Sequence, residues 1–350
     1  MKRHEIHWDR MQRCAVLLLG AASLACAPVP RPGDEVQIGE ESAIIIWDPA
    51  AKTQHFIRRA SFRTKAKDFG FLVPTPTIPK LEEADDDAFR LLGKITAPEV
   101  VHRSVARGTP VPKTASRVTV ITTANVAGYD ATILEATDAE ALNRWLGEHG
   151  YASSPELVEW FKPYLEQKWK ISAFKIAGDD KEGAVSTKAV RMSFQTDKPF
   201  FPYREPVAQS RSRDDFNSRL LRVYFLAEAR YGGAIGVDTE WPSRTVWSNR
   251  IDKEGRAELL RLAKLPADSV PNARWLTEFL DHSSPRSNAD EVYFSVANNQ
   301  DKVQRPDELR YTYYDRNDHD GNEYWVIGIG IVAGVFLFVF FLSRRLWRKA

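Results

Sequence analysis

The sequence predicts an α+β fold with largely antiparallel sheets, a helical hairpin packed on them, and a single C-terminal transmembrane helix. Three observations predict it. Strand patterns occur without regular βαβ alternation, two helix-start signals follow one another closely, and an uncharged segment precedes a run of arginines. The 350 residues are 43% hydrophobic and 27% charged, which is the balance of a folded chain with one large domain or two smaller ones.

The clearest strand pattern begins at Ser42. Residues 42–47 (SAIIIW) are a continuous, largely β-branched run, which predicts a strand buried on both faces that ends at Asp48. Residues 54–62 predict its hairpin partner, and residues 69–73 predict a third strand. Further strands are expected over residues 118–125, 129–135, 170–176, 189–194, 220–227, 292–296 and 309–314.

Helices are expected where capping side chains precede an apolar stripe. The sequences TDAE, from Thr137, and SSPE, from Ser153, are two capping boxes and predict the helical hairpin, with His149 on the core face of the first helix. Other helices are expected over residues 82–95, 253–263 and 272–281, a Pro-rich linker over 27–34, and an irregular segment over 97–116.

The segment from Trp325 to Leu342 (WVIGIGIVAGVFLFVFFL) carries no charge. Eighteen helical residues span about 27 Å, close to the roughly 30 Å of a bilayer core. We therefore expect a transmembrane helix over residues 324–342 and a localisation in the cell membrane. The basic tail, residues 343–350, is expected in the cytoplasm because an excess of Lys and Arg marks the cytoplasmic side. The residues that set this topology are Arg344, Arg345, Arg348 and Lys349.

Residues 1–27 have the basic start, short apolar run and small residues of a secretory signal, whether translation begins at Met1 or Met11. Two kinds of processing are compatible with it. The sequence SLAC would make Cys26 a lipidated N-terminus, whereas ACA would be cleaved after Ala27.

The domain between the two ends is expected to be extracytoplasmic. It covers residues 28–320, with a subdomain break near 180–215. The only cysteines, Cys14 and Cys26, precede it, so it has no internal disulfide and no thiolate chemistry.

Several segments resemble the bacterial domain of unknown function 2330 family, over roughly residues 40–230. They are AIIIWDP from Ala43, HFIRRASF from His55, DFGFLVPTP from Asp68, AEALNRWLGEHGY from Ala139 and RMSFQTDKPFFPYREP from Arg191. The resemblance implies a bacterial, exported and often membrane-anchored protein. It supplies no activity and no catalytic residues.

The candidates for a catalytic site are Asp48, His55 and Asp68. In a functional interpretation, His55 is a general base oriented by a carboxylate. In a structural interpretation, which we favour, His55 belongs to a cross-strand polar pair, because no nucleophile or metal-ligand set accompanies it. The sequence has no P-loop, GxSxG or HExxH motif.

Two further patterns favour structural roles. Residues 315–322 (DRNDHDGN) miss the register of an EF-hand, since Gly321 falls seventh and Val326 twelfth. The aromatic residues could line a sugar or peptide groove, but core packing is the commoner role. They are the FFPY sequence from Phe200 and Trp160, Trp169, Trp241, Trp247 and Trp275.

We expect a membrane-anchored envelope protein that binds or scaffolds rather than catalyses. Its partners would be the lipid bilayer and an envelope protein or ligand, without cofactor or metal. Nucleic acid is not expected as a partner, because the charge outside the two basic ends is mildly acidic. The alternative is an envelope hydrolase with a polar site near Asp48, His55 and Asp68.

Overall fold

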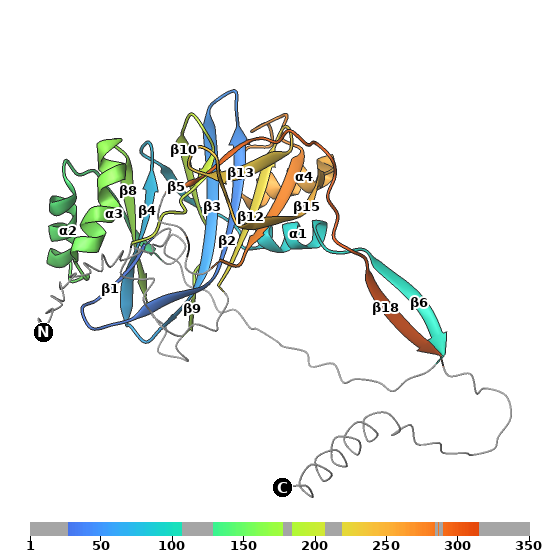
Figure 1. The fold of residues 1–350 in the computed structure, drawn as a ribbon, viewed down its shortest axis with the longest axis horizontal. Helices are drawn as coiled ribbons and strands as arrows, with labels where there is room; N and C mark the ends of the chain where they lie inside the picture. Colours follow the sequence, from blue (N-terminus) through green and yellow to red (C-terminus); the bar gives the residue numbers. More distant parts are fainter. Residues whose placement is uncertain are drawn as a thin grey trace, which may run out of the picture. The chain divides into compact units, whose positions relative to one another are not determined.

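The computed structural model describes residues 27–106, 129–177, 184–206, 219–283, 286 and 290–314. The chain divides into two compact units, residues 1–99 with 118–307, and residues 100–117 with 308–350. The described part of the first unit is mostly β-sheet with a few helices (Figure 1).

The large sheet of the first unit has eight strands in the order β15-β16-β12-β2-β3-β10-β5, with β9 paired to β3 outside this path. All neighbouring pairs are antiparallel except β12 and β2, so the prediction of largely antiparallel sheets is confirmed. The strands are β2 (Val36–Asp48), β3 (Thr53–Thr64), β5 (Lys80–Glu83), β9 (Ala184–Ser186), β10 (Val190–Gln195), β12 (Leu220–Ala227), β15 (Ser243–Arg250) and β16 (Trp275–Asp281).

The hairpin of β2 and β3 forms the centre of this sheet. Ile44 and Ile46 belong to the hydrophobic cluster on one face of the sheet, and Ile45 belongs to the cluster on the other. All three are fully buried, which confirms a strand buried on both faces. A β-bulge between Ile38 and Glu41 shifts the register of β2 just before this segment.

Helices α1 (Asp87–Ile95) and α4 (Lys253–Leu262) cover one face of the large sheet, where Phe89, Leu92 and Leu259 share a hydrophobic cluster with Ile44 and Ile46. The predicted helix over residues 82–95 begins later than expected. The reason is that residues 80–83 pair with β10 as an edge strand, and Asp86 then precedes the helix.

A small sheet has the order β1-β4-β8-β7 and lies between the large sheet and helices α2 and α3 (Figure 1). These elements are β1 (Ala27–Pro30), β4 (Asp68–Thr75), β7 (Tyr129–Leu134), β8 (Lys170–Ala177), α2 (Ala139–Glu148) and α3 (Pro155–Glu166). The Pro-rich linker expected over residues 27–34 was wrong in part, because its first four residues form β1. Prolines are tolerated there because β1 is an edge strand with one partner, β4.

The helical hairpin is present, with each cap one residue later than the capping boxes predict. The carboxylate of Asp138, not the hydroxyl of Thr137, accepts the N–H of Ala141 at 2.7 Å and caps α2. Likewise Ser154, not Ser153 of the predicted SSPE box, caps α3 by accepting the N–H of Leu157. The position expected for His149 was wrong: its side chain is exposed and stacks on Trp145 with ring centroids 3.9 Å apart.

A third sheet has the order β11-β17-β13-β14 and consists of β11 (Phe200–Phe201), β17 (Val292–Val296), β13 (Tyr231–Ile235) and β14 (Thr239–Glu240). Phe294 of this sheet packs on Phe225 and Phe279 of the large sheet. Gly233 permits a close approach, since a Cβ there would lie 2.7 Å from the Trp241 ring.

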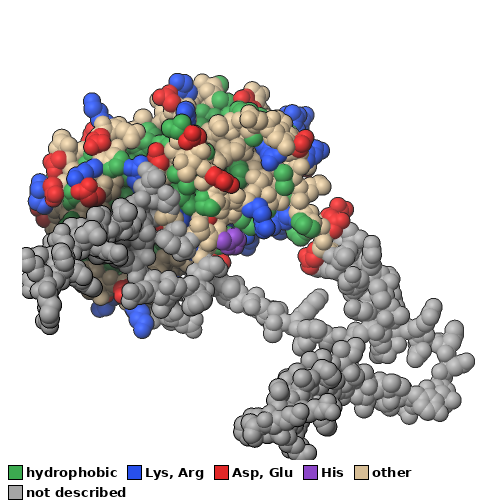
Figure 2. All heavy atoms as spheres, in the orientation of Figure 1, with side chains coloured by type: hydrophobic (Ala, Val, Ile, Leu, Met, Phe, Trp, Pro, Cys, Tyr) green, Lys and Arg blue, Asp and Glu red, His purple; other side chains and the backbone are tan. Residues whose placement is uncertain are grey.

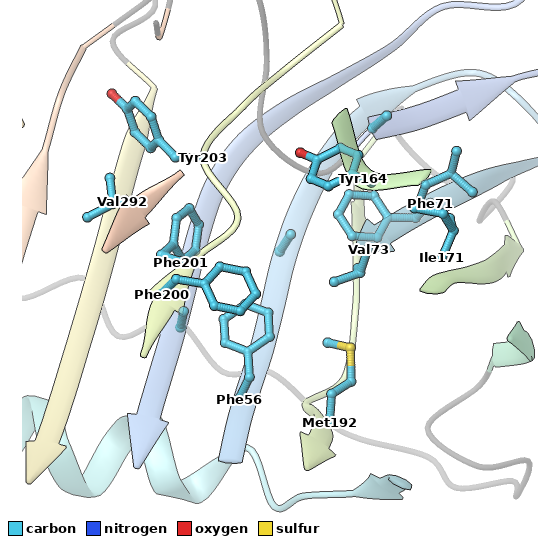
Figure 3. Close-up of a cluster of buried hydrophobic side chains, with 14 of the residues drawn as sticks. Phe56, Phe71, Val73, Tyr164, Ile171, Met192, Phe200, Phe201, Tyr203 and Val292 are labelled. Carbon is cyan, nitrogen blue, oxygen red and sulfur yellow. The ribbon is translucent and has the colours of Figure 1, made fainter. Parts of the chain in front are cut away.

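Aromatic side chains fill the core between the sheets (Figure 3). Phe200, Phe201 and Tyr203 are fully buried, and the five tryptophans named in the sequence analysis are each at most 8% exposed. The prediction that these residues belong to the core is therefore confirmed.

One predicted helix is a strand. Residues 275–281, expected within a helix over 272–281, form β16 and pair on both sides, with β12 and β15. The segment 97–116, expected to be irregular, contains a strand in the second unit. There β6 (Val100–Ala106) and β18 (Glu308–Tyr314) form a parallel two-stranded sheet.

Several predictions concern residues outside the described part of the chain. They are the signal with Cys26, the strand over 118–125, the acidic segment 315–322, the span from Trp325 to Leu342 and the basic tail. Among the described residues, no helix has the length and apolar character needed to cross a membrane. The large sheet takes strands from both sides of residues 180–215, so the expected subdomain break does not divide it.

Candidate functional site

The three candidate catalytic residues have different partners. His55 lies opposite Ser193 on β10, and its Nδ1 is 2.9 Å from the Ser193 hydroxyl. Asp48 accepts the backbone N–H groups of the turn that follows β2. Asp68 belongs to the small sheet, where it accepts two hydrogen bonds from Arg31, at 2.5 and 2.8 Å. The structure does not bring the three together into one hydrogen-bonded site.

The electrostatics of His55 also disfavour a general base. Burial, aided by the charge of Arg191, lowers the pKa of His55 to about 4. An imidazole with such a pKa is neutral at pH 7 and accepts a proton poorly. The cross-strand contact with Ser193 is the polar pair of the structural interpretation, with a hydroxyl in place of a carboxylate.

A buried group of charged side chains, here called the ionic cluster, lies on the face of β2 and β3 opposite to His55. It consists of Glu41, Arg58, Glu205, Arg219 and Arg286, each at most 7% exposed. The Nε of Arg58 donates to one oxygen of Glu41 at 2.7 Å, and an Nη1 of Arg286 donates to the other at 3.1 Å. Arg219 joins the two acids, at 2.6 Å from Glu205 and 3.4 Å from Glu41.

The two carboxylates of the ionic cluster differ in charge. Burial alone would raise the pKa of Glu41, but three guanidinium groups outweigh it and lower the pKa to about 2. Burial dominates at Glu205 and raises its pKa to about 8. At neutral pH, Glu41 is therefore ionised and Glu205 is largely protonated.

The sequence analysis did not predict the ionic cluster, although the residue pattern of the β2–β3 hairpin indicates two of its members. Glu41 precedes Ala43 and Ile45 on one face of β2, and Arg58 follows Phe56 on the facing side of β3. The alternation of the hairpin therefore places a carboxylate and a guanidinium on a buried face. The other members come from segments far along the chain, and the hairpin gives no signal for them.

An open depression of about 590 Å³, here called the lysine depression, lies on the first unit. Its lining contains Lys80, Lys168 and Lys170 and no acidic residue among the described ones. The other lining residues are the hydroxyl-bearing Thr53, Thr77 and Ser193, together with Pro76, Ile78, Phe194 and Gln195.

The lysines of the depression differ in their partners. Lys170 pairs with Glu135 at 2.5 Å and Lys80 with Glu82 at 3.2 Å. The amino group of Lys168 has no ion pair with a described residue. Lys168 follows the C-terminal end of α3, and its backbone φ is 57°. Ile78, 66% exposed, adds an apolar contact to this charged lining. The lining therefore offers positive charge, hydroxyl groups and apolar surface together.

Comparison with known proteins assigns the family. The model described as "Uncharacterized protein conserved in bacteria (DUF2330)" matches residues 20–262, more than half of the chain. The chain belongs to this family. The family segment contains every lining residue of the lysine depression and all of the ionic cluster except Arg286.

Other comparisons add little to the family assignment. No curated protein matches this DUF2330 chain. The crystal structure of baculovirus P35 is similar over 78% of this chain and 98% of that one, with 5% identity and a TM-score of 0.38, a level that does not establish a common fold. Among the described residues, no group of three or more His, Cys, Asp or Glu side chains could hold a metal ion.

Proposed function

We propose that this DUF2330 protein is a membrane-anchored binding protein of the cell envelope whose folded domain takes an anionic ligand in the lysine depression. The observation that carries the proposal is the lining of that depression, with three lysines and no acid among its described residues. A volume of about 590 Å³ lies within the range of ligand sites.

The ion pairs at the rim do not prevent binding. The side chain of Lys80 is 73% exposed, and that of Glu135, the partner of Lys170, is 71% exposed. An exposed pair such as that of Lys80 contributes little to stability, so an incoming anion can replace its carboxylate at small cost. Lys170 is only 14% exposed, but its exposed partner Glu135 is free to move away into solvent. On the face shown in Figure 2, acidic and basic side chains are interspersed over the described residues.

Membrane anchoring rests on the sequence. The uncharged segment from Trp325 to Leu342 and the basic tail support one span with the folded domain outside the cytoplasm. The place of β1 supports lipidation at Cys26 over cleavage after Ala27. Ala27 is fully buried and pairs with Leu72, so cleavage after it would remove a core residue and leave a charged terminus at buried Pro28.

The binding proposal is tested with inorganic polyphosphate as the probe, using the full chain in detergent at low and moderate salt. The variant Lys80→Gln/Lys168→Gln should bind polyphosphate about two- to tenfold more weakly, because each exposed charge contributes only a small attraction. Its affinity should also depend less on salt, because fewer charges remain for salt to screen. Isothermal titration calorimetry gives both quantities.

The matched control is Lys94→Gln/Lys264→Gln. It also removes two exposed lysines, one with a positive φ, but at the ends of α1 and α4 outside the depression. Its affinity should equal that of the wild type. Equal losses in both double variants, or no binding by the wild type at low salt, would contradict a site in the lysine depression.

A further inference from the structure

A small cavity of about 20 Å³ lies between the large and small sheets, separate from the lysine depression. Its walls are mostly apolar and come from β3, β4, β8 and β10, with Phe71, Val190 and Met192 among them. A volume of this size holds one water molecule or one monatomic ion. Figure 3 shows Phe71 and Met192 among the buried side chains between the sheets.

The charged residue in the cavity wall is Arg58, which is 6% exposed. Its Nε donates to Glu41, and its Cζ lies 3.8 Å from the centroid of the Phe71 ring. Its Nη2 has no hydrogen-bond partner among the described residues. A buried N–H without a partner is costly, and it is commonly satisfied by an unseen water or ion.

The other polar groups of the wall already donate their hydrogens elsewhere. The Tyr129 hydroxyl donates to the carbonyl of Lys188 at 2.9 Å, and the Thr187 hydroxyl donates to the carbonyl of Ala60 at 2.9 Å. The unused donor in this apolar space is therefore a cationic one, on Arg58.

The charge balance of the ionic cluster points the same way. Three arginines face Glu41 and Glu205, and Asp281 adds a third acid to the surroundings of Arg286. With Glu205 protonated at neutral pH, the acids no longer balance the arginines. One bound monovalent anion restores neutrality within this low-dielectric region.

We propose that the inter-sheet cavity at Arg58 binds a single halide-type anion, which receives a hydrogen bond from the Arg58 Nη2. This site is independent of the lysine depression, since none of its lining residues is shared. Because the anion binds the folded chain only, it stabilises the fold in proportion to its occupancy.

The test compares thermal unfolding of the full chain in sodium chloride, sodium bromide and sodium gluconate at equal ionic strength. Chloride and bromide should raise Tm by a few degrees, with saturation, whereas gluconate is too large for the cavity and should not. In crystals grown with bromide, an anomalous peak should lie within hydrogen-bonding distance of the Arg58 Nη2.

Two variants separate this cavity from other halide effects. Val190→Ile adds one methylene to the cavity wall without touching a charge, and it should abolish the halide-dependent rise in Tm. Val246→Ile adds the same group to a buried valine of β15, outside the cavity, and should keep the rise. If wild-type Tm is equal in chloride and gluconate, or if Val190→Ile keeps the halide response, the cavity holds water only and the proposal is overturned.

Discussion

Glu41 is the residue on which the buried ion pairs converge, since all three arginines of the ionic cluster contact it. Its side chain is wholly inaccessible and follows the β-bulge of β2, which aims it at the interior. The alternation of the β2–β3 hairpin places Glu41 and Arg58 on the same buried face, but the sequence analysis did not predict their contact. The hairpin gives no signal for Arg219 or Arg286, because tertiary contacts alone bring them to Glu41.

Replacing Glu41 by Gln should lower the free energy of unfolding by about 3–5 kcal/mol, because it leaves buried guanidinium groups without their counter-charge. Urea unfolding followed by tryptophan fluorescence measures the change. The control is Glu258→Gln, which breaks an Arg–Glu pair of similar length on the surface of α4 and should change stability little. Equal stability of the two variants would mean that the cluster does not depend on the charge of Glu41.

Elements with a strong local pattern were predicted well. The strands over residues 220–227 and 292–296 have the predicted bounds, because both are rich in β-branched and aromatic residues and lie between polar segments. The strand over residues 275–281 was predicted wrongly as a helix, since its apolar residues also fall at helical spacing, at positions 275, 276, 279 and 280. Pairing with two neighbouring strands decides in favour of the sheet there.

Short edge strands gave no local signal. Strands β1, β5 and β11 have two to four residues each, which is too few for a period to appear. Their hydrogen bonds to longer neighbours determine their conformation. The sequence therefore predicted the centres of the sheets better than their edges.

The cap of α2 offers a test at the scale of one element. Asp138→Ala should cost about 1 kcal/mol, because the N–H of Ala141 loses its acceptor. Thr137→Ala, one residue earlier, should cost much less. Thermal or urea unfolding of the two variants decides between Asp138 and Thr137, and a larger loss for Thr137→Ala would restore the capping box expected from the sequence.

At the scale of the whole molecule, the proposed topology places the C-terminus in the cytoplasm and the N-terminus outside it. In sealed inverted membrane vesicles, a protease should remove a tag placed after Ala350 and leave the folded domain intact. In spheroplasts the tag should be protected. The mass of the mature N-terminus should include acyl chains on Cys26. Protection of the tag in inverted vesicles, or a terminus downstream of Ala27, would contradict the proposal.

The parallel pair of β2 and β12 determines when the fold can be completed. Glu40 lies beside Leu220, so one of the first strands of the domain gains its second neighbour only after most of the chain has been made. Contacts so distant in sequence slow folding and leave apolar strands exposed in the meantime. Strand β16, the next neighbour of β12, lies beyond the family segment, which ends at residue 262. A truncation at that boundary would therefore release a chain whose central sheet ends in an open, apolar edge and is prone to aggregate.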